Sequence, residues 1–203
     1  MGKTFERIDE SIRAWIARQK MFFVATAPSA IDGHINCSPK GHDSFRILDD
    51  TTVAYRDLTG SGIETVAHLK DNGRIVIMFC AFEGPPKIVR FHGQGEVLEP
   101  DHDDFAEIAT AFGAASDAEE MGTRAFIRVR VSRISDSCGY SVPAYDYVSD
   151  RDILLKWNDN KGADGVKAYQ HTKNATSIDG LPGLKQDSTQ ASPGTADSQS
   201  RAL

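Results

Sequence analysis

The pattern of apolar and polar positions predicts a chain of short strands with a few helices between them. Residues 74–82 form an almost continuous apolar run, which is typical of a strand with both faces covered. Residues 124–134 alternate strictly between apolar and polar side chains, as in a strand with one covered face. The same signals predict further strands at 21–27, 34–38, 45–48, 51–56 and 87–98. Gly93 and Gly95 indicate a bulge or bend in the last of these.

Other segments repeat their apolar residues every three or four positions, the spacing of an amphipathic helix. This pattern predicts helices over 4–19, over about 63–71, and from Pro100 to Phe112. Asn72-Gly73 is a good signal for the end of the second helix. Beyond the strands, two more helical pieces are predicted, one from about Asp152 and one ending at Lys173-Asn174.

The strands follow one another through turns, without a regular alternation of strand and helix. This order favours a mainly β fold, a small antiparallel β-barrel flanked by helices, over a doubly wound parallel sheet. We therefore expect an N-terminal helix packed on the barrel, the barrel itself, a helical and loop extension, and a disordered tail rich in Ser, Thr, Gln, Gly and Pro. The predicted boundaries are 1–20, 21–134, 135–184 and 185–203.

Composition narrows the function classes. The 203 residues are 40% hydrophobic with a net charge of −6, so the chain has no overall basic character for binding nucleic acid or an anionic membrane. Its three cysteines are sparse, and its longest apolar run, 75–82, is too short to span a membrane. Without a signal-peptide pattern, the sequence favours a cytoplasmic protein. The six histidines show no metal-binding spacing, so we expect no metal.

The stretch 55–69 has the order strand, glycine-containing loop, helix. Glycines allow backbone N–H groups to turn inward, and the first turn of a helix leaves such groups unpaired, so an anion can bind there. We interpret residues 59–62 as a phosphate cradle. The loop lacks the Lys-Ser or Lys-Thr of a P-loop, and an ordinary turn with a helix N-cap is the alternative.

Several motifs occur in a fixed order along the chain. They are Asn36-Cys-Ser-Pro-Lys-Gly41, Asp57-Leu-Thr-Gly-Ser-Gly62, Met78-Phe-Cys-Ala-Phe-Glu-Gly-Pro-Pro86, Ser137-Cys-Gly-Tyr140 and Ser177-Ile-Asp-Gly-Leu-Pro-Gly183. Together they make residues 5–184 resemble the pyridoxamine 5'-phosphate oxidase-related flavoproteins. The likeness is to a branch with the Ser-Cys-Gly-Tyr and Asp-Gly-Leu-Pro-Gly signatures.

The resemblance implies a split β-barrel homodimer with two FMN molecules at the subunit interface. It also implies candidate FMN contacts, which are Ser38, Lys40, Tyr55, Arg56, Thr59, Gly60, Ser61, Thr65 and Arg90. Many relatives carry an Arg-Lys pair near the positions of Ser61 and Thr65. Because this chain has no base there, Lys40, Arg56 or Arg90 must supply the positive charge for the phosphate.

Simpler alternatives exist for these residues. Lys40, Arg90, and the pair Tyr55 and Arg56 could be exposed surface side chains. Cys138 and Tyr140 could approach the flavin from the other subunit, and a buried structural cysteine is the alternative. Trp157 could stack near the cofactor or, alternatively, anchor a helix.

The implied activity is that of an FMN-dependent oxidoreductase, in which the flavin supplies the redox chemistry. The chain lacks an Arg-Leu-His-Asp-Arg-like run near its C-terminus, so oxidation of vitamin B6 is disfavoured. The sequence names neither a substrate nor a catalytic residue. A non-catalytic flavin-binding module is the second hypothesis, with heme or deazaflavin binding in the same barrel as a variant.

Overall fold

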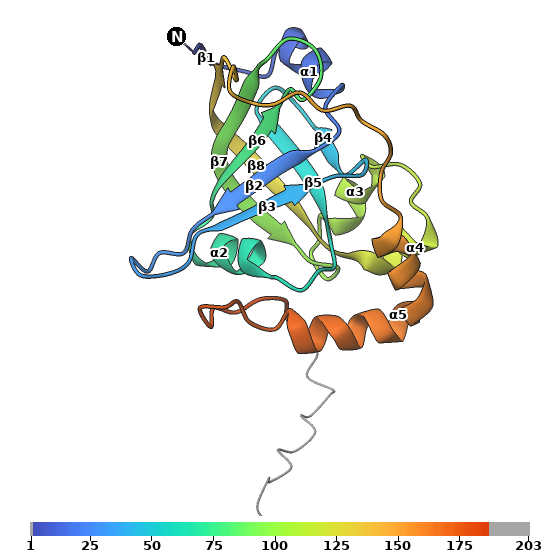
Figure 1. Ribbon diagram of the computed structural model, residues 1–203. Coiled ribbons are helices and arrows are strands. Elements are labelled where there is room, and N and C mark those ends of the chain that lie inside the picture. The colour runs from blue at the N-terminus through green and yellow to red at the C-terminus, as the bar shows by residue number, and fades with distance from the viewer. Residues whose placement is uncertain (1, 187–203) are drawn as a thin grey trace, which may run out of the picture.

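The computed structural model describes residues 2–186 as one curled antiparallel sheet with helices around it (Figure 1). The eight strands run in the order β3-β2-β6-β7-β8-β5-β4, and β1 pairs with β8. Their bounds are β1 Thr4–Phe5, β2 Phe22–Thr26, β3 Asn36–Lys40, β4 Phe45–Ile47, β5 Thr52–Leu58, β6 Arg74–Cys80, β7 Ile88–Leu98 and β8 Thr123–Ser137. The predicted antiparallel split barrel with flanking helices is confirmed.

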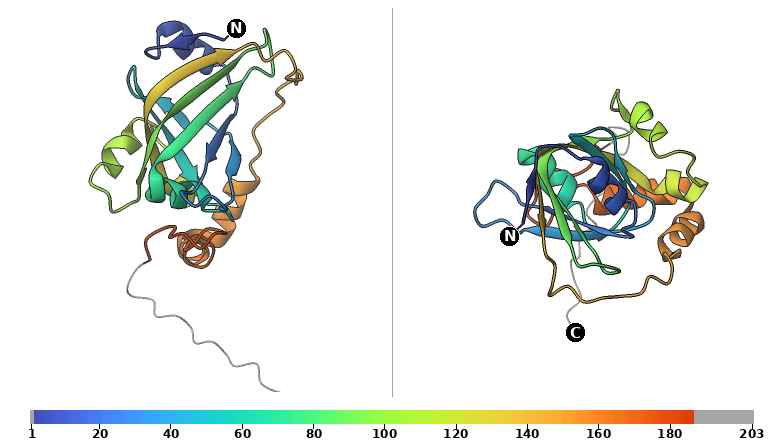
Figure 2. Two further views of the ribbon diagram at one scale, coloured as in Figure 1. Left: turned by 90° about the vertical axis from the view of Figure 1, so that its left-hand side faces the viewer. Right: turned by 90° about the horizontal axis from the view of Figure 1, so that it is seen from above.

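The main core fills the inside of the curled sheet. Inward-facing residues of β2, β5, β6, β7 and β8 lose all contact with water, among them Val24, Tyr55, Ile77 and Phe91. The whole of β7 pairs with residues 126–137 of β8, and the register shifts between His92 and Gly93. The irregularity predicted near Gly93 is present, but the extra residue is Ser132, so the bulge lies in β8 and not in β7. Figure 2 shows the strands curving around this core when the barrel is seen from above.

The helices cover the ends and one side of the barrel. Their bounds are α1 Glu10–Ile16, α2 Glu64–Asn72, α3 Phe105–Thr110, α4 Asp117–Gly122 and α5 Ile153–Lys173. As predicted, α2 ends at Gly73, whose φ of 72° is the left-handed conformation that favours glycine. In α5, Gly162 (φ 67°) breaks the helical geometry, so the two helical pieces predicted for this segment are joined at a kink.

Some predicted boundaries are wrong. The N-terminal helix is shorter than the predicted 4–19, because Phe5 belongs to β1 and pairs with Ile134 of β8. Helix α4 was not predicted, because its apolar residues are few and it is fixed mainly by a capping box between Ser116 and Glu119. The predicted tail begins at residue 185, and its residues 187–203 lie outside the described part of the chain.

The barrel is open between its two edge strands, β3 and β4. Among the described residues, β4 pairs with residues 53–55 of β5, so the last residues of β5 face β3 across the opening without a backbone ladder. We call this gap the seam. Within residues 2–186, no helix is both long and apolar enough to cross a membrane.

Candidate functional site

A buried carboxylate bridges the seam. Asp57 at the end of β5 has no solvent exposure, and its Oδ1 accepts a hydrogen bond of 2.6 Å from Lys40 Nζ on β3. Its Oδ2 accepts a hydrogen bond of 2.8 Å from Arg124 Nε on β8. Arg124 also donates to the carbonyl of Gly62 at 2.8 Å, so the same guanidinium holds the loop after β5.

The pair of cations keeps Asp57 ionised. Burial raises the pKa of this carboxyl, but the charges of Arg124 and Lys40 outweigh it and lower the pKa to about 2. The Lys40 side chain is only partly exposed, and its ammonium forms an ion pair with Asp57 of β5. The alternative of an exposed surface lysine is therefore wrong. Arg124 was not among the predicted site residues. Its position in an alternating strand gave no sign that it faces a buried acid.

Polar side chains continue along the seam from Lys40 towards α2. Ser38 Oγ donates to Asn36 Oδ1 at 2.9 Å, and Asn36 Nδ2 donates to Thr65 Oγ1 at 3.0 Å. Thr65 lies in the first turn of α2, so the structure brings the predicted residues Ser38 and Thr65 together through Asn36. Behind them, the buried His68 shares a hydrogen bond of 2.9 Å with Thr26.

The cradle, residues 59–62, is anchored by its carbonyl and hydroxyl groups. Thr59 Oγ1 donates to the carbonyl of Gly122 at 2.9 Å and accepts from Gln170 at 2.7 Å. The carbonyl of Gly60 accepts from Asn174 at 2.9 Å. Ser61 is exposed. The strand, loop and helix predicted for this stretch are present.

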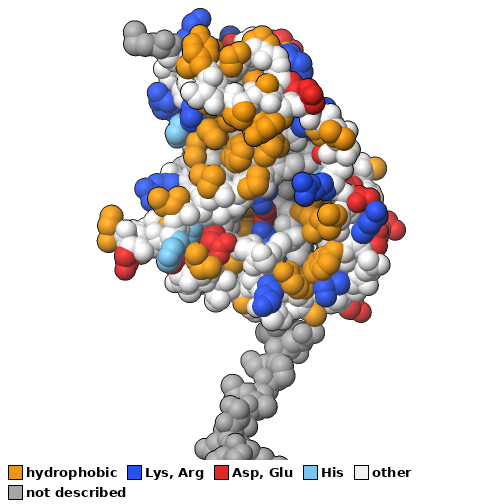
Figure 3. All heavy atoms as spheres, viewed as in Figure 1, with side chains coloured by type: hydrophobic (Ala, Val, Ile, Leu, Met, Phe, Trp, Pro, Cys, Tyr) orange, Lys and Arg blue, Asp and Glu red, His pale blue; other side chains and the backbone are white. Residues whose placement is uncertain are grey.

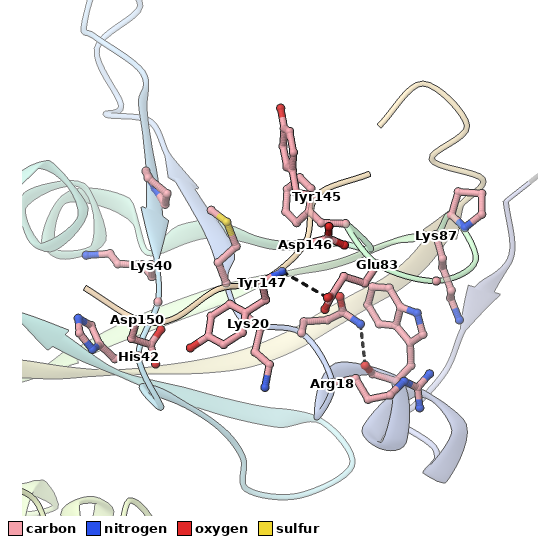
Figure 4. A pocket seen from close by; sticks show the side chains of 18 of the residues that line it. Arg18, Lys20, Lys40, His42, Glu83, Lys87, Tyr145, Asp146, Tyr147 and Asp150 are labelled. Carbon is pink, nitrogen blue, oxygen red and sulfur yellow. Dashed lines mark hydrogen bonds between the residues drawn. The ribbon is translucent and has the colours of Figure 1, made fainter. Parts of the chain in front are cut away.

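A large cavity of about 1450 Å³ opens beside the Lys40 end of the seam. One wall is the barrel, with Lys40, His42 and Arg56, and the other is the segment 138–152, which we call the strap. The strap runs in an extended conformation from β8 to α5, past the β6–β7 turn (Figure 1). Figure 4 shows Lys40, His42 and Asp150 at one end of this cavity and Lys87 at the other.

The strap is held to the barrel by aromatic side chains and backbone groups. Tyr145 stacks on Phe82 with ring centroids 5.6 Å apart, and its N–H donates to the carbonyl of Phe82 at 2.9 Å. The ammonium of Lys20 lies 5.2 Å from the centre of the Tyr147 ring. The Tyr147 N–H donates to Glu83, as the dashed line in Figure 4 shows.

The cavity is basic although the chain is acidic. Seven Lys and Arg residues line it, against four Asp and Glu residues, while the whole chain carries a net charge of −6. Such a local excess of positive charge attracts anions. His42, in the turn after β3, is also in the lining, and it has a φ of 57°, a conformation that is costly for a residue with a Cβ.

The remaining predicted residues separate onto different faces. Tyr55 points into the core, whereas Arg56 points away from it and lines the cavity. Both are buried, so the alternative of an exposed strand pair is wrong. Arg90 is only partly exposed, lies on the outer face of the sheet and donates to Ser137 Oγ at 3.0 Å. One chain therefore does not bring Arg90 into the cavity lining.

Two motif residues occupy the cavity wall. Cys138 is exposed there, so the alternative of a buried structural cysteine is wrong. Tyr140 is exposed beside it. Trp157 packs across the kink of α5 against Tyr169, with ring centroids 4.9 Å apart, which agrees with the alternative that it anchors a helix.

The outer face of the sheet carries apolar side chains that the chain itself does not cover. Pro39, Phe23 and Met78 form one row across β3, β2 and β6, and Ala25 and Val76 belong to the next row. These side chains are partly or fully exposed. Figure 3 shows apolar side chains gathered over the middle of this face, above a hollow with charged atoms inside it.

Comparison with known proteins assigns the chain to a family. The sequence model of pyridoxamine 5'-phosphate oxidase matches residues 8–138. The chain belongs to the pyridoxamine 5'-phosphate oxidase family. Within this family it is 36% identical over 197 residues to the pyridoxamine 5'-phosphate oxidase family protein ustO of Aspergillus flavus, covering 89% of this chain and 77% of that protein.

Two solved structures illustrate what the chain is similar to. A crystal structure of a HupZ variant from Group A Streptococcus aligns with a TM-score of 0.50 and 28% identity, covering 64% of this chain and 99% of the other. A FAD-binding protein from Mesorhizobium loti aligns with a TM-score of 0.45 and 14% identity, covering 67% of this chain and 96% of the other. The resemblance stated from the sequence motifs is confirmed at the level of the family and the split barrel.

Proposed function

We propose that this protein is an FMN-dependent oxidoreductase that works as a homodimer with the flavin at the subunit interface. The observation that carries the proposal is a row of polar side chains on one face of β3, formed by Asn36, Ser38 and Lys40. At one end Ser38 donates to Asn36, which donates to Thr65 in the first turn of α2, and at the other end Lys40 lines the large basic cavity. The five residues of β3 extend over about 13 Å, a length suited to a ribityl chain with its phosphate.

The residues present fit the cofactor at both ends. At the cradle, a Cβ added to Gly60 would meet nothing within 4 Å, so the loop is open on that side. Ser61 is exposed, and Ile63, the N-cap residue of α2, makes no side-chain capping hydrogen bond, which leaves hydroxyl and N–H donors for a phosphate. Glu64 in the first turn of α2 disfavours a phosphate at the cradle, because its negatively charged carboxylate lies close to Gly62.

At the other end of β3, Lys40 would face the flavin ring. A flavin held there supplies the hydride and electron transfer, while the protein supplies position and electrostatics. Lys40, already hydrogen-bonded to Asp57, presents a fixed positive charge at the mouth of the cavity. Such a preorganised charge stabilises negative charge that develops on a bound group.

The homodimer is supported by the outer face of β2, β3 and β6. Apolar rows such as Pro39, Phe23 and Met78 are suited to burial against a second copy. In that arrangement Arg90, which shares the outer face, could reach the cofactor of the partner. The predicted contact between Arg90 and FMN would then form across the dimer interface, since a single chain does not bring Arg90 into the cavity.

Purified protein tests the proposal directly. We expect a yellow protein with flavin absorbance that is bleached by NADH or NADPH and reoxidised in air. Flavin absorbance that neither NADH nor NADPH bleaches would support the non-catalytic module instead, and a Soret band would support heme.

Titration of FMN into variants tests the placement along β3. Lys40→Ala removes a charge-assisted contact, so we expect about ten- to a hundredfold weaker FMN binding. Lys20→Ala is the control, because Lys20 lines the same cavity but contacts the Tyr147 ring instead of the seam. Equal FMN affinity in Lys40→Ala and the native protein would show that the cofactor lies elsewhere.

A further inference from the structure

Two arginines flank the ring of Phe112, and only one of them has its donors satisfied. Arg46 lies 5.1 Å from the ring centre, donates from Nη1 and Nη2 to Asp43, both at 2.7 Å, and donates from Nε to the carbonyl of Ala111 at 3.0 Å. Arg56 lies 5.5 Å from the same ring, but its Nε has no hydrogen-bond partner among the described residues.

The guanidinium of Arg56 is also poorly neutralised. Its side chain is 9% exposed, and Glu119 Oε1 lies 3.8 Å from Nη1, beyond hydrogen-bond distance. The carboxylate of Glu119 is instead used by Ser116, whose N–H and hydroxyl both donate to Oε2. A buried charged donor without an acceptor costs free energy. An anion bound beside Arg56 would supply that acceptor and recover part of this cost.

Arg56 lines the cavity, and the aromatic rings of Phe112 and Phe126 exclude water from its other side. His42 is in the same part of the wall. Hydrogen bonds from Ser116 lower the pKa of Glu119, and the charges of Arg56 and His42 lower it further, which places both basic groups near one carboxylate. The strap side of the cavity offers the rings of Tyr145 and Tyr147.

The charge of this region distinguishes between kinds of anion. Lys40 and Arg124 share the ionised Asp57, so their excess charge at the seam is a single positive charge. Arg56 adds one guanidinium, partly offset by Glu119. A planar monoanion matches a single guanidinium, which can bind a carboxylate with two parallel hydrogen bonds. One guanidinium can balance the whole charge of a carboxylate but only half the charge of a phosphate dianion.

We propose that the cavity binds a substrate that carries a carboxylate attached to an aromatic or other flat apolar body, with Arg56 as the residue that determines specificity for the carboxylate. The apolar body lies between the barrel wall and the strap tyrosines. This inference rests on the proposed function, because it assigns the substrate of the oxidoreductase, and it gives Arg56 a role different from the predicted contact with the FMN phosphate.

Binding of simple probes to the full-length protein tests the inference without turnover. We expect 3-phenylpropionate to bind at least tenfold more tightly than its uncharged amide and more tightly than phenyl phosphate, as measured by calorimetry with and without FMN. Trp15 lines the cavity, so in a Trp157→Phe background the same titration should change its fluorescence. Equal affinities for the acid and the amide would overturn the proposal.

Variants of the two arginines give the matched comparison. Arg56→Gln should weaken 3-phenylpropionate about ten- to a hundredfold and leave the affinity for the amide and for FMN unchanged, whereas Arg46→Gln should change none of them. Arg56→Lys keeps the charge and the fold but loses the two parallel N–H donors of the guanidinium, so it should give an intermediate loss of 3-phenylpropionate affinity. If Arg56→Gln weakened FMN and not the probe, Arg56 would be a cofactor ligand and the inference would be wrong. If the protein bound the probe but did not bind FMN, the proposed function would be wrong while the carboxylate site at Arg56 would stand.

Discussion

Asp57 is the residue on which the seam depends. It is a fully buried carboxylate held by cations from two other strands, and no other hydrogen-bonded link between β3 and β5 is present among the described residues. Removing one partner of a buried ion pair leaves the others uncompensated, which costs more than the pair contributes when it is intact. The seam is therefore the part of the barrel most sensitive to a single substitution.

Asp57→Asn should destabilise the protein by about 3–5 kcal/mol, because Lys40 and Arg124 keep their charges without a carboxylate between them. Urea unfolding measures this loss. Asp43→Asn is the control, since Asp43 pairs with Arg46 at the surface with its side chain 86% exposed, and a change within about 0.5 kcal/mol is expected there.

Asp57 should also make the stability of the protein depend on pH in the acid range. The pKa of Asp57 is about 2 in the folded protein, below the ordinary 3.8, so its contribution is present above pH 4 and is lost as the pH falls towards 2. The shift corresponds to roughly 2 kcal/mol. Unfolding curves between these pH values should therefore decline less steeply for Asp57→Asn than for the native protein, and identical slopes would show that Asp57 is not held ionised.

At the scale of elements, residues 174–184 explain one of the sequence motifs. The Ser177-to-Gly183 motif forms a small hairpin in which the N–H of Gly183 donates to the carbonyl of Ala175 and that of Leu184 to the carbonyl of Asn174. Asn174 in turn donates to the carbonyl of Gly60. The C-terminal extension is thus part of the support for the cradle. The sequence predicted a loop here but not what it contacts.

Gly183→Ala should destabilise this hairpin, because the added Cβ would lie 2.2 Å from the backbone oxygen of Asn174. We expect a loss of about 1–3 kcal/mol and faster hydrogen exchange in residues 59–66. Gly165→Ala is the matched control: it lies in α5, meets only the flexible side chain of Lys161, and should be neutral or slightly stabilising. If hydrogen exchange at the cradle were unchanged in Gly183→Ala, the C-terminal extension would not be a support of the cradle.

At the scale of the whole molecule, the apolar rows on the outer face are the surface on which the proposed dimer depends. Met78 lies between Phe23 and Arg90 in one row of the outer face. Met78→Lys should dissociate the proposed dimer at micromolar concentrations, as measured by sedimentation equilibrium, and should lower FMN occupancy with it. Ile178→Lys, at an exposed site on the C-terminal hairpin, should leave the dimer intact. A native protein that binds FMN as a monomer would contradict the interface.

The sequence by itself determined most of the elements and the strand–loop–helix order of residues 55–69, because periodicity, glycine turns and helix-end signals act over a few neighbouring residues. The family and the split barrel came from the resemblance of motifs spread along the chain. Only the tertiary structure decided which side chains meet. Lys40 and Arg124 lie 17 and 67 positions from Asp57, and α4 and the strap lack a strong local pattern. Arg56 and Tyr55 are neighbours in the chain, yet one strand places them on opposite faces, and it is this placement that separates the core from the cavity.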